Sequence, residues 1–158
     1  MTRTICIIII LLSCFSCRQA TELTEKEKSE IAITIRQTLD NYYNDIRKSG
    51  LLAELNYLDS SANFCWVPPG YTQSITYDSV VSILKQNAPN FKYIDNSFDT
   101  LRIIPLTKEL ATYTGKLHTT ITDTINNQVT FSLIETGVLI KRADGWKLLN
   151  GQTGPIQQ

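Results

Sequence analysis

Residues that usually carry metal or nucleophilic chemistry are scarce in this sequence. It has one histidine, His118, and of its four cysteines three, at positions 6, 14 and 17, lie near the N-terminus. One histidine without a cysteine or acidic cluster beside it cannot supply the three protein ligands of a catalytic zinc site. Glycine-rich phosphate-binding runs such as GxGxxG are also missing. We therefore expect no metal and no cofactor.

The sequence also lacks an excess of charge of either sign. Fifteen basic residues balance fifteen acidic residues, so the formal net charge is zero. Nucleic-acid binding needs lysine and arginine concentrated on one face. The balance therefore argues against a nucleic-acid partner and gives no reason to expect electrostatic attraction of a charged substrate.

The N-terminal segment has the pattern of a targeting sequence. Arg3 precedes the short apolar run ICIIIILL, which is much shorter than the roughly 20 residues of a transmembrane helix. Leu11-Leu12-Ser13-Cys14 resembles a bacterial lipobox, and Cys17 offers the alternative register. We expect a lipoprotein signal peptide over 1–13, lipid on Cys14 and a tether over 14–23. A plain secretory signal or an uncleaved anchor is the alternative.

This interpretation places the protein in the bacterial cell envelope, held to the membrane by its N-terminal lipid and facing the periplasm or the cell surface. After processing, Cys65 is the one cysteine left in the folded domain, so no internal disulfide can form. We expect Cys65 to act as a small buried hydrophobic residue.

Helices are predicted in the first half of the domain. Thr24 and Glu27 form a capping box, and apolar residues then recur at helical spacing until Gly50, which predicts a helix over about 25–48. A leucine stripe over 51–58 predicts a shorter helix. FCWVPPG predicts a short strand closed by prolines, because prolines are excluded from central strands. Thr76 or Asp78 can begin a third helix.

From Phe91 onward the apolar period changes from helical to alternating. Residues 109–124 alternate strictly, with Ala111, Tyr113 and Leu117 on the face suited to a core and His118 on the polar face. Residues 130–151 predict a hairpin that turns at Asp144-Gly145. Helices followed by antiparallel strands predict an α+β fold, with the helices on one face of a curved, mainly antiparallel sheet.

The order of elements resembles the nuclear transport factor 2-like superfamily, including SnoaL-like domains and ketosteroid isomerases. The resemblance covers about 24–154 and rests on the long helix, the leucine-rich segment, FCWVPPG, and the ending VLIKRADGWKLLNGQTG. It implies a cone-shaped, cystatin-like roll with a cavity between the long helix and the sheet. In this superfamily the cavity hosts catalysis, ligand binding or only a packed core.

Two carboxylates are candidates for acid–base chemistry in such a cavity, Glu135 and Asp59. Glu135 interrupts the apolar strand SLIETGVLI and shares a face with Phe131, Leu133 and Leu139. Both faces of this strand are partly apolar, so the period does not decide whether Glu135 points inward. Asp59 follows the leucine stripe, where an acidic residue before Ser-Ser commonly forms a turn.

Aromatic and amide side chains are the candidates for ligand binding. Tyrosine and tryptophan combine apolar rings with a hydrogen-bonding atom, which suits a small pocket. The expected ligand-binding residues are Tyr42, Trp66, Tyr71, Tyr113, Glu135 and Asn150. The final strand ends in Asn150-Gly151-Gln152, where catalytic relatives often carry histidine, and amides do not exchange protons near neutral pH.

We therefore expect an envelope-anchored, non-catalytic domain that binds a small apolar or amphipathic molecule. One alternative is a homodimer or periplasmic interaction module that uses the open sheet face. The other is an isomerase- or cyclase-type enzyme with Glu135 or Asp59 as its base.

Overall fold

The computed structural model describes residues 22–156. The long helix α2 spans Glu25–Ser49, and its capping box is formed as expected, with the Glu27 amide donating to the Thr24 hydroxyl and the Glu27 carboxylate accepting from the Thr24 amide. Gly50 ends the helix at a φ of 85°, a conformation that favours glycine. The apolar face of α2 buries Ile35, Leu39, Tyr42, Tyr43 and Ile46.

Shorter elements connect α2 to the long strands. The leucine stripe forms a 3₁₀ helix, η1 (Leu51–Asn56), and FCWV contributes the short strand β1 (Cys65–Val67). Thr76 caps α3 (Tyr77–Asn87), and a 3₁₀ turn, η2 (Ala88–Asn90), leads into the sheet. The four long strands are β2 (Phe91–Pro105), β3 (Leu110–Asp123), β4 (Gln128–Arg142) and β5 (Gly145–Pro155).

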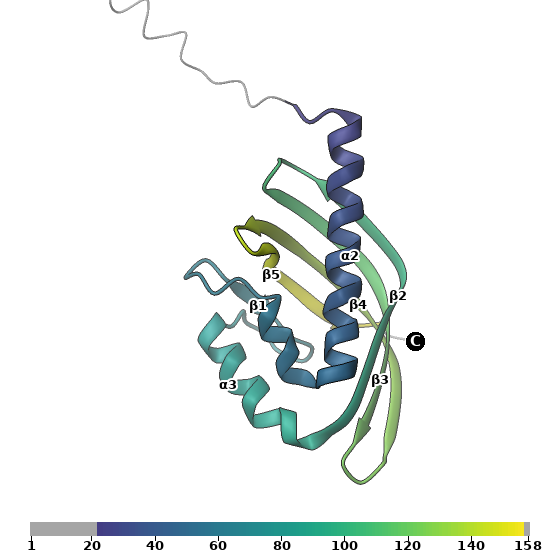
Figure 1. The fold of residues 1–158 in the computed structure, drawn as a ribbon. Helices are drawn as coiled ribbons and strands as arrows, with labels where there is room; N and C mark the ends of the chain where they lie inside the picture. The colour runs from purple at the N-terminus through teal and green to yellow at the C-terminus, as the bar shows by residue number, and fades with distance from the viewer. Residues whose placement is uncertain (1–21, 157–158) are drawn as a thin grey trace, which may run out of the picture.

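The sheet has the order β1-β5-β4-β3-β2, and every pairing is antiparallel except β1 with β5. It curves around α2, which lies across its concave face, with α3 beside one end of that helix (Figure 1). This arrangement confirms the predicted α+β fold. The hairpin turn between β4 and β5 also lies where Asp-Gly predicted it, with Gly145 at a φ of 120°.

The concave face carries the core, as the alternation in β3 predicted. Ala111, Tyr113 and Leu117 are buried, whereas His118 is exposed on the outer face. In β4 the odd-numbered side chains point inward, including Leu133, Glu135 and Leu139. The sequence left the direction of Glu135 open, and the structure turns it toward the core.

Register shifts in β2 and β5 change which of their side chains face inward. Leu148 of β5 pairs with Leu139 of β4, but Asn150 pairs with Val138, the next residue of β4. Leu149 is therefore an extra residue in β5, a β-bulge. Before it the even-numbered Trp146 and Leu148 are buried, and after it the odd-numbered Thr153 is buried. A simple alternation would have grouped Asn150 and Gln152 with Trp146 instead. The bulge is the reason that they are not.

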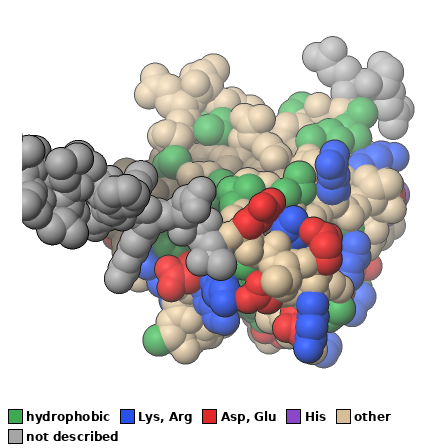
Figure 2. All heavy atoms as spheres, turned by 90° about the horizontal axis from the view of Figure 1, so that it is seen from above, with side chains coloured by type: hydrophobic (Ala, Val, Ile, Leu, Met, Phe, Trp, Pro, Cys, Tyr) green, Lys and Arg blue, Asp and Glu red, His purple; other side chains and the backbone are tan. Residues whose placement is uncertain are grey.

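Charged side chains of both signs are interspersed on the face seen from above in Figure 2. Several form exposed pairs near the start of α2, including Lys108 with Glu27 at 2.7 Å and Lys28 with Glu25 at 2.8 Å. Exposed pairs of this kind contribute little to stability. The mixture matches the balanced composition of the chain.

The predicted signal peptide, both candidate lipidation cysteines and most of the tether lie outside the described residues. Within 22–156, no helix combines the length and the apolar character that crossing a membrane requires. Cys65 is the free cysteine of this range and is partly buried.

Candidate ligand-binding cavity

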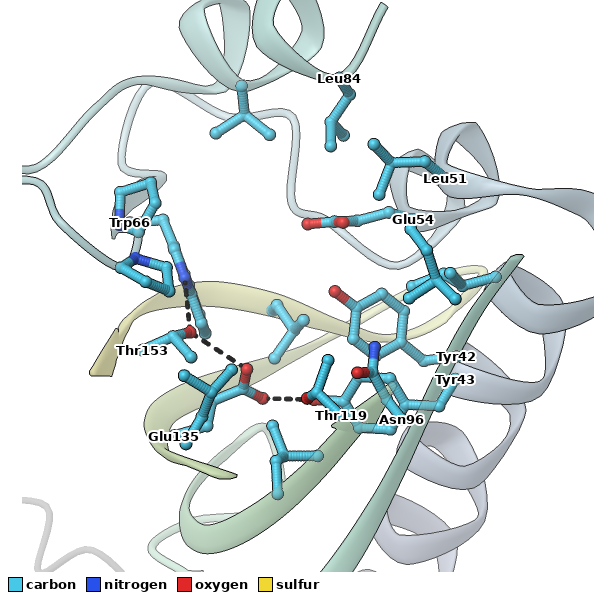
Figure 3. Close-up of a pocket in the computed structure, with 18 of the residues that line it drawn as sticks. Tyr42, Tyr43, Leu51, Glu54, Trp66, Leu84, Asn96, Thr119, Glu135 and Thr153 are labelled. Carbon is cyan, nitrogen blue, oxygen red and sulfur yellow. Dashed lines mark hydrogen bonds between the residues drawn. The ribbon is translucent and has the colours of Figure 1, made fainter. Parts of the chain in front are cut away.

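A cavity of about 330 Å³ lies between the helices and the concave face of the sheet. Its wall is mainly apolar, and its size is within the range of small-molecule sites. The apolar and aromatic lining comes from α2, η1, β1, α3 and the four long strands, together with Pro68, Pro69 and Ile75 of the connecting loop. Figure 3 shows the polar groups among this lining, of which the carboxylates are Glu54 and Glu135.

Glu135 lies on the sheet wall of the cavity and is only 6% exposed. Its Oε1 accepts hydrogen bonds from the hydroxyls of Tyr43 and Tyr113, both at 2.7 Å. Its Oε2 accepts from the Thr153 hydroxyl at 3.1 Å. Tyr43 comes from α2, Tyr113 from β3 and Thr153 from β5, so three elements converge on one carboxylate.

Burial controls the protonation of this cluster. Removal from water raises the pKa of Glu135, while the hydrogen bonds from Tyr113, Tyr43 and Thr153 lower it without reversing the shift. Burial, followed by the charge of Glu135, raises the pKa of Tyr43 and Tyr113 well above the usual value. Both hydroxyls therefore keep their protons and remain donors at physiological pH.

Trp66 extends the hydrogen-bond chain to the edge strand. Its indole Nε1 donates to the Thr153 hydroxyl at 3.2 Å, and Thr153 donates in turn to Glu135 (Figure 3). The indole lies over two paired glycines, Gly137 and Gly151. A Cβ at Gly151 would overlap the indole, 2.6 Å away, and the Thr136 carbonyl oxygen. Glycine at this position therefore makes room for the ring.

Glu54 is the second carboxylate of the cavity and comes from η1. It lies near the Tyr42 hydroxyl in Figure 3. Burial raises the pKa of Glu54, the charge of Glu135 raises it further, and interaction with the Tyr42 hydroxyl lowers it; the resulting pKa is about 7. Glu54 can therefore change charge near neutral pH, which is the property expected of an acid–base group.

Thr119 brings an unsatisfied polar atom to the cavity wall. It is 4% exposed, and its Oγ1 has no hydrogen-bond partner among the described residues. Thr119 pairs with Asn96 of β2 and with Phe131 of β4, so Asn96 is its neighbour in the same row of the sheet. Both polar side chains line the cavity. Buried polar atoms normally have partners, so an orphan at a cavity wall calls for an explanation.

The sequence-predicted ligand residues divide into two groups. Tyr42, Trp66 and Glu135 line the cavity, and Tyr113 lies behind the wall, where it binds Glu135. Tyr71 is 47% exposed on the loop after Pro69 and is not part of the lining. Asn150 is also outside the lining. It follows the bulge at Leu149 and pairs with Val138, so it lies on the outer face of the sheet.

Asp59 has a structural role away from the cavity. It is 3% exposed, and its Oδ2 accepts from the Arg142 Nε at 2.5 Å. Its Oδ1 accepts from the Ser61 amide at 3.0 Å, the turn contact that its sequence context suggests. The Arg142 hydrogen bond is the largest influence and lowers the pKa of Asp59 to about 2. A carboxylate held in its charged form by arginine is a poor candidate for a general base.

Glu54, Thr119 and Thr153 are among the cavity residues that sequence reasoning missed. Glu54 had a signal, because it lies three residues after Leu51 and four before Leu58, and so shares their helical face. Thr119 lies two residues after Leu117 and so shares its inward face by alternation, but it was not predicted as a ligand contact. Thr153 had no signal, because its direction depends on the bulge.

The described residues contain no group of three histidine, cysteine or acidic side chains that could hold a metal ion. The two cavity carboxylates are accompanied by neutral hydroxyl, indole and amide groups. The arrangement can therefore bind a small molecule through apolar contacts and hydrogen bonds, and it can exchange a proton through Glu54.

Solved structures with the same fold have little sequence similarity to this chain. A proposed dehydratase of the NTF2-like family from Streptomyces avermitilis aligns with a TM-score of 0.71 and 14% identity, covering 83% of this chain and 99% of that protein. A protein with a cystatin-like fold from Caulobacter vibrioides aligns with a TM-score of 0.63 and 12% identity, covering 80% and 89%. A hexachlorocyclohexane dehydrochlorinase from Novosphingobium barchaimii aligns with a TM-score of 0.63 and 10% identity, covering 82% and 89%.

These identities support a shared fold and no more. No curated protein matches the chain. The model of the SnoaL-like domain, however, matches residues 35–153, which include α2 from Ile35 and nearly all of the sheet. That match covers most of the sequence and every polar group of the cavity. The chain therefore belongs to the family of SnoaL-like domains.

Proposed function

We propose that this domain binds a small, mainly apolar molecule in the cavity and does not transform it. The supporting observation is the cavity of about 330 Å³, which is lined mostly by apolar and aromatic side chains. A few polar groups, Glu54, Glu135 and Thr119, are available to orient the ligand. Sites for small molecules generally combine these two features.

Thermal unfolding of the full chain in the presence of small aromatic and aliphatic alcohols tests this function. A ligand that binds only the folded state raises the melting temperature with concentration. The variant Ile83→Trp fills the cavity from α3 and should abolish the shift. Val81→Trp, on the same helix but outside the lining, is the matched control and should retain it. A cavity that accepts no probe would contradict the proposal.

Acid–base catalysis is the second candidate, and one observation favours it. Glu54 has a pKa of about 7 and lines the cavity, so it could take a proton from a bound neutral ketone near physiological pH. Deuterium exchange at the carbon beside a ketone, followed by NMR, tests this activity. Glu54→Gln should slow the exchange by about 100-fold or more, while the exposed Glu30→Gln should not. Exchange at the uncatalysed rate in the wild type would exclude it.

We also propose that the domain is tethered to the cell envelope by lipid on Cys14, with Cys17 as the alternative. The support is the LLSC sequence that follows the apolar run. Mass spectrometry of the N-terminal peptide from membrane fractions tests it. Cys14→Ala should release the protein or abolish the lipid mass, and an unmodified N-terminus would contradict the assignment.

Self-association through the outer face of the sheet remains a further proposal. Ile134 of β4 and Ile104 of β2 are 46% and 42% exposed on that face. Light scattering at high protein concentration tests it, with Ile134→Lys as the disrupting variant. A monomer at all concentrations would overturn it.

A further inference from the structure

The charged groups of the cavity wall are all of one sign. Glu54 and Glu135 are its carboxylates, and no lysine, arginine or histidine is among the lining residues that the structure describes. The single histidine of the chain, His118, is exposed on the opposite face of the sheet. Coulomb interactions are strong in a site that water leaves. An anionic ligand would therefore be repelled, and a cation would be attracted.

The two carboxylates differ in how much acceptor capacity they have left. Glu135 already accepts hydrogen bonds from Tyr43, Tyr113 and Thr153. The Glu54 carboxylate lies near the Tyr42 hydroxyl. No other side chain among the described residues donates a hydrogen bond to it. A carboxylate offers about four acceptor positions. Glu54 is thus the better placed of the two to bind a donor on the ligand.

The aromatic lining also favours a cation. Tyr42, Phe64, Trp66 and Phe91 belong to the wall and come from four different segments. Aromatic faces attract ammonium groups, most strongly where water is excluded. The same rings provide apolar surface for the body of a ligand. Neutral molecules would gain only the second of these contributions.

Thr119 gives independent evidence that the cavity is built for an occupant. Its buried hydroxyl lines the cavity without a protein partner among the described residues, opposite Asn96 in the sheet. An unpaired buried hydroxyl is destabilising, and valine would fill the same space without this penalty. A ligand that hydrogen-bonds to Thr119 would explain why the polar residue is present.

We propose that the ligand is a protonated amine on an apolar body, with its ammonium group bound at Glu54 and its body against the aromatic and aliphatic wall. The inference rests on the proposed binding function and specifies the ligand class. Glu135 adds a negative charge behind the site, and its own hydrogen bonds hold it in place.

Binding of such a ligand should depend on pH. The titratable groups that face Glu54 are Tyr42 of α2 and Glu135 of β4, and those that face Glu135 are Tyr43 and Tyr113. The tyrosines remain protonated, because burial raises their pKa. Glu54 must lose its proton to pair with the ammonium group. The affinity for an amine should therefore rise from pH 5 to about 7, near the pKa of Glu54, and then level off.

Three probes with one apolar body test the proposal: 4-phenylbutylamine, 4-phenylbutanol and 4-phenylbutanoic acid. Their binding to the full chain at pH 8 is measured by isothermal titration calorimetry. Titration of each probe into the same detergent-containing buffer without protein is the blank. We expect the amine to bind at least tenfold more tightly than the alcohol, and the acid to bind more weakly than both. If the alcohol binds as tightly as the amine, the amine proposal is overturned while the binding function stands. If none of the three binds, the binding function itself fails.

The variant Glu54→Gln separates the charge from the shape of the site. It should reduce amine affinity about tenfold and change alcohol affinity less than threefold. Glu30→Gln, an exposed residue of α2, is the matched control and should change neither. Because alcohol binding reports that the cavity is intact, a misfolded variant would be recognised. An undiminished preference for the amine in Glu54→Gln would overturn the assignment of the ammonium group to Glu54.

Discussion

Glu135 and Asp59 are two buried carboxylates of the same domain with opposite electrostatics. Glu135 is 6% exposed and Asp59 is 3% exposed, so their burial is nearly equal. Neutral hydroxyls surround Glu135, and its pKa is raised by burial. Asp59 pairs with Arg142, and its pKa is lowered to about 2. The positive charge of Arg142 and the position of Asp59 on a surface groove both favour its charged form, whereas burial among neutral hydroxyls disfavours the charged form of Glu135.

The two carboxylates also differ in role, because Asp59 holds two segments of the fold together and Glu135 belongs to the cavity. The Asp59–Arg142 pair links the segment after η1 to the β4–β5 hairpin and lies outside the cavity. The hydroxyl cluster lies on the cavity wall, where the Glu135 carboxyl group faces a bound ligand. Substitutions at the two acids and around them test this contrast at the level of stability.

The largest effect is expected at Gly151, which supports the Glu135 cluster. Gly151→Ala would place a Cβ against the Thr136 carbonyl oxygen and the Trp66 ring, and the resulting overpacking should destabilise the fold by about 3 kcal/mol. Gly154→Ala is the matched control, because no atom lies within 4 Å of the position that its Cβ would take. Urea unfolding and tryptophan fluorescence measure the effect. Equal stability of the two variants would contradict the packing of Trp66 on Gly151.

Neutral amides at the two acids should have unequal effects. Asp59→Asn removes the charge that Arg142 requires and should destabilise the protein by about 2 kcal/mol at pH 7. Glu135→Gln keeps an acceptor for Tyr43 and Tyr113 and removes a charge that burial disfavours, so it should change stability by less than about 1 kcal/mol. Chemical denaturation of both variants compares them directly. A larger loss of stability in Glu135→Gln than in Asp59→Asn would contradict the proposed difference between the two acids.

The pH dependence of stability should also follow the two directions. The pKa of Glu54 is about 7 in the folded protein, above its ordinary value of 4.5, so the folded state holds this proton more tightly than the unfolded state. Its contribution to stability is therefore full below pH 4.5 and declines as pH rises to about 7. Asp59 acts oppositely, and its contribution declines as pH falls from 3.8 toward 2.

Glu54→Gln should remove the first of these changes. The variant should be more stable than the wild type by about 3 kcal/mol at pH 8, and the two proteins should be nearly equal at pH 4. Denaturant unfolding across this pH range measures the difference, with Glu30→Gln as the control. A constant difference between pH 4 and pH 8 would show that Glu54 titrates normally.

The smallest effect is expected at Thr119. Among the described residues its hydroxyl has no hydrogen-bond partner, charged or neutral. Thr119→Val keeps the shape of the side chain and removes the unpaired buried oxygen, so it should stabilise the ligand-free protein by about 1 kcal/mol. Thermal unfolding measures this gain. A loss of stability would indicate that the hydroxyl does have a hydrogen-bond partner in solution.

Much of the fold could be predicted, because local signals agree with the final structure. The capping box at Thr24, the stop at Gly50 and the Asp-Gly turn each follow from a short-range preference. The alternation in β3 also predicted the core face, including Tyr113 and Leu117. Such signals depend on residues close in the sequence, and the family resemblance then supplied the way in which the elements assemble.

The site was less predictable, because it depends on contacts between distant residues. Alternation identified the neighbours of Glu135 in β4 but not the direction of that face, which is decided by packing on α2. Asn150 was predicted as a ligand residue because the strand was assumed to be regular. Glu54 was overlooked because its segment was interpreted only as an apolar stripe, although a carboxylate on such a stripe is itself a signal.

The bulge at Leu149 has a consequence for insertions and deletions. Trp146 and Leu148 precede it with even numbers inward, and Thr153 follows it with an odd number inward. Deleting Leu149 would remove the extra residue and give β5 a continuous alternation in which Thr153 still pairs with Glu135. Deleting Gln152 instead would move Thr153 to the outer face and bring Gly154 beside Glu135. The loss of one codon after the bulge thus decides whether a hydroxyl of β5 donates a hydrogen bond to Glu135. A lineage of such domains could change ligand chemistry by a length change in this strand without any substitution on the cavity wall.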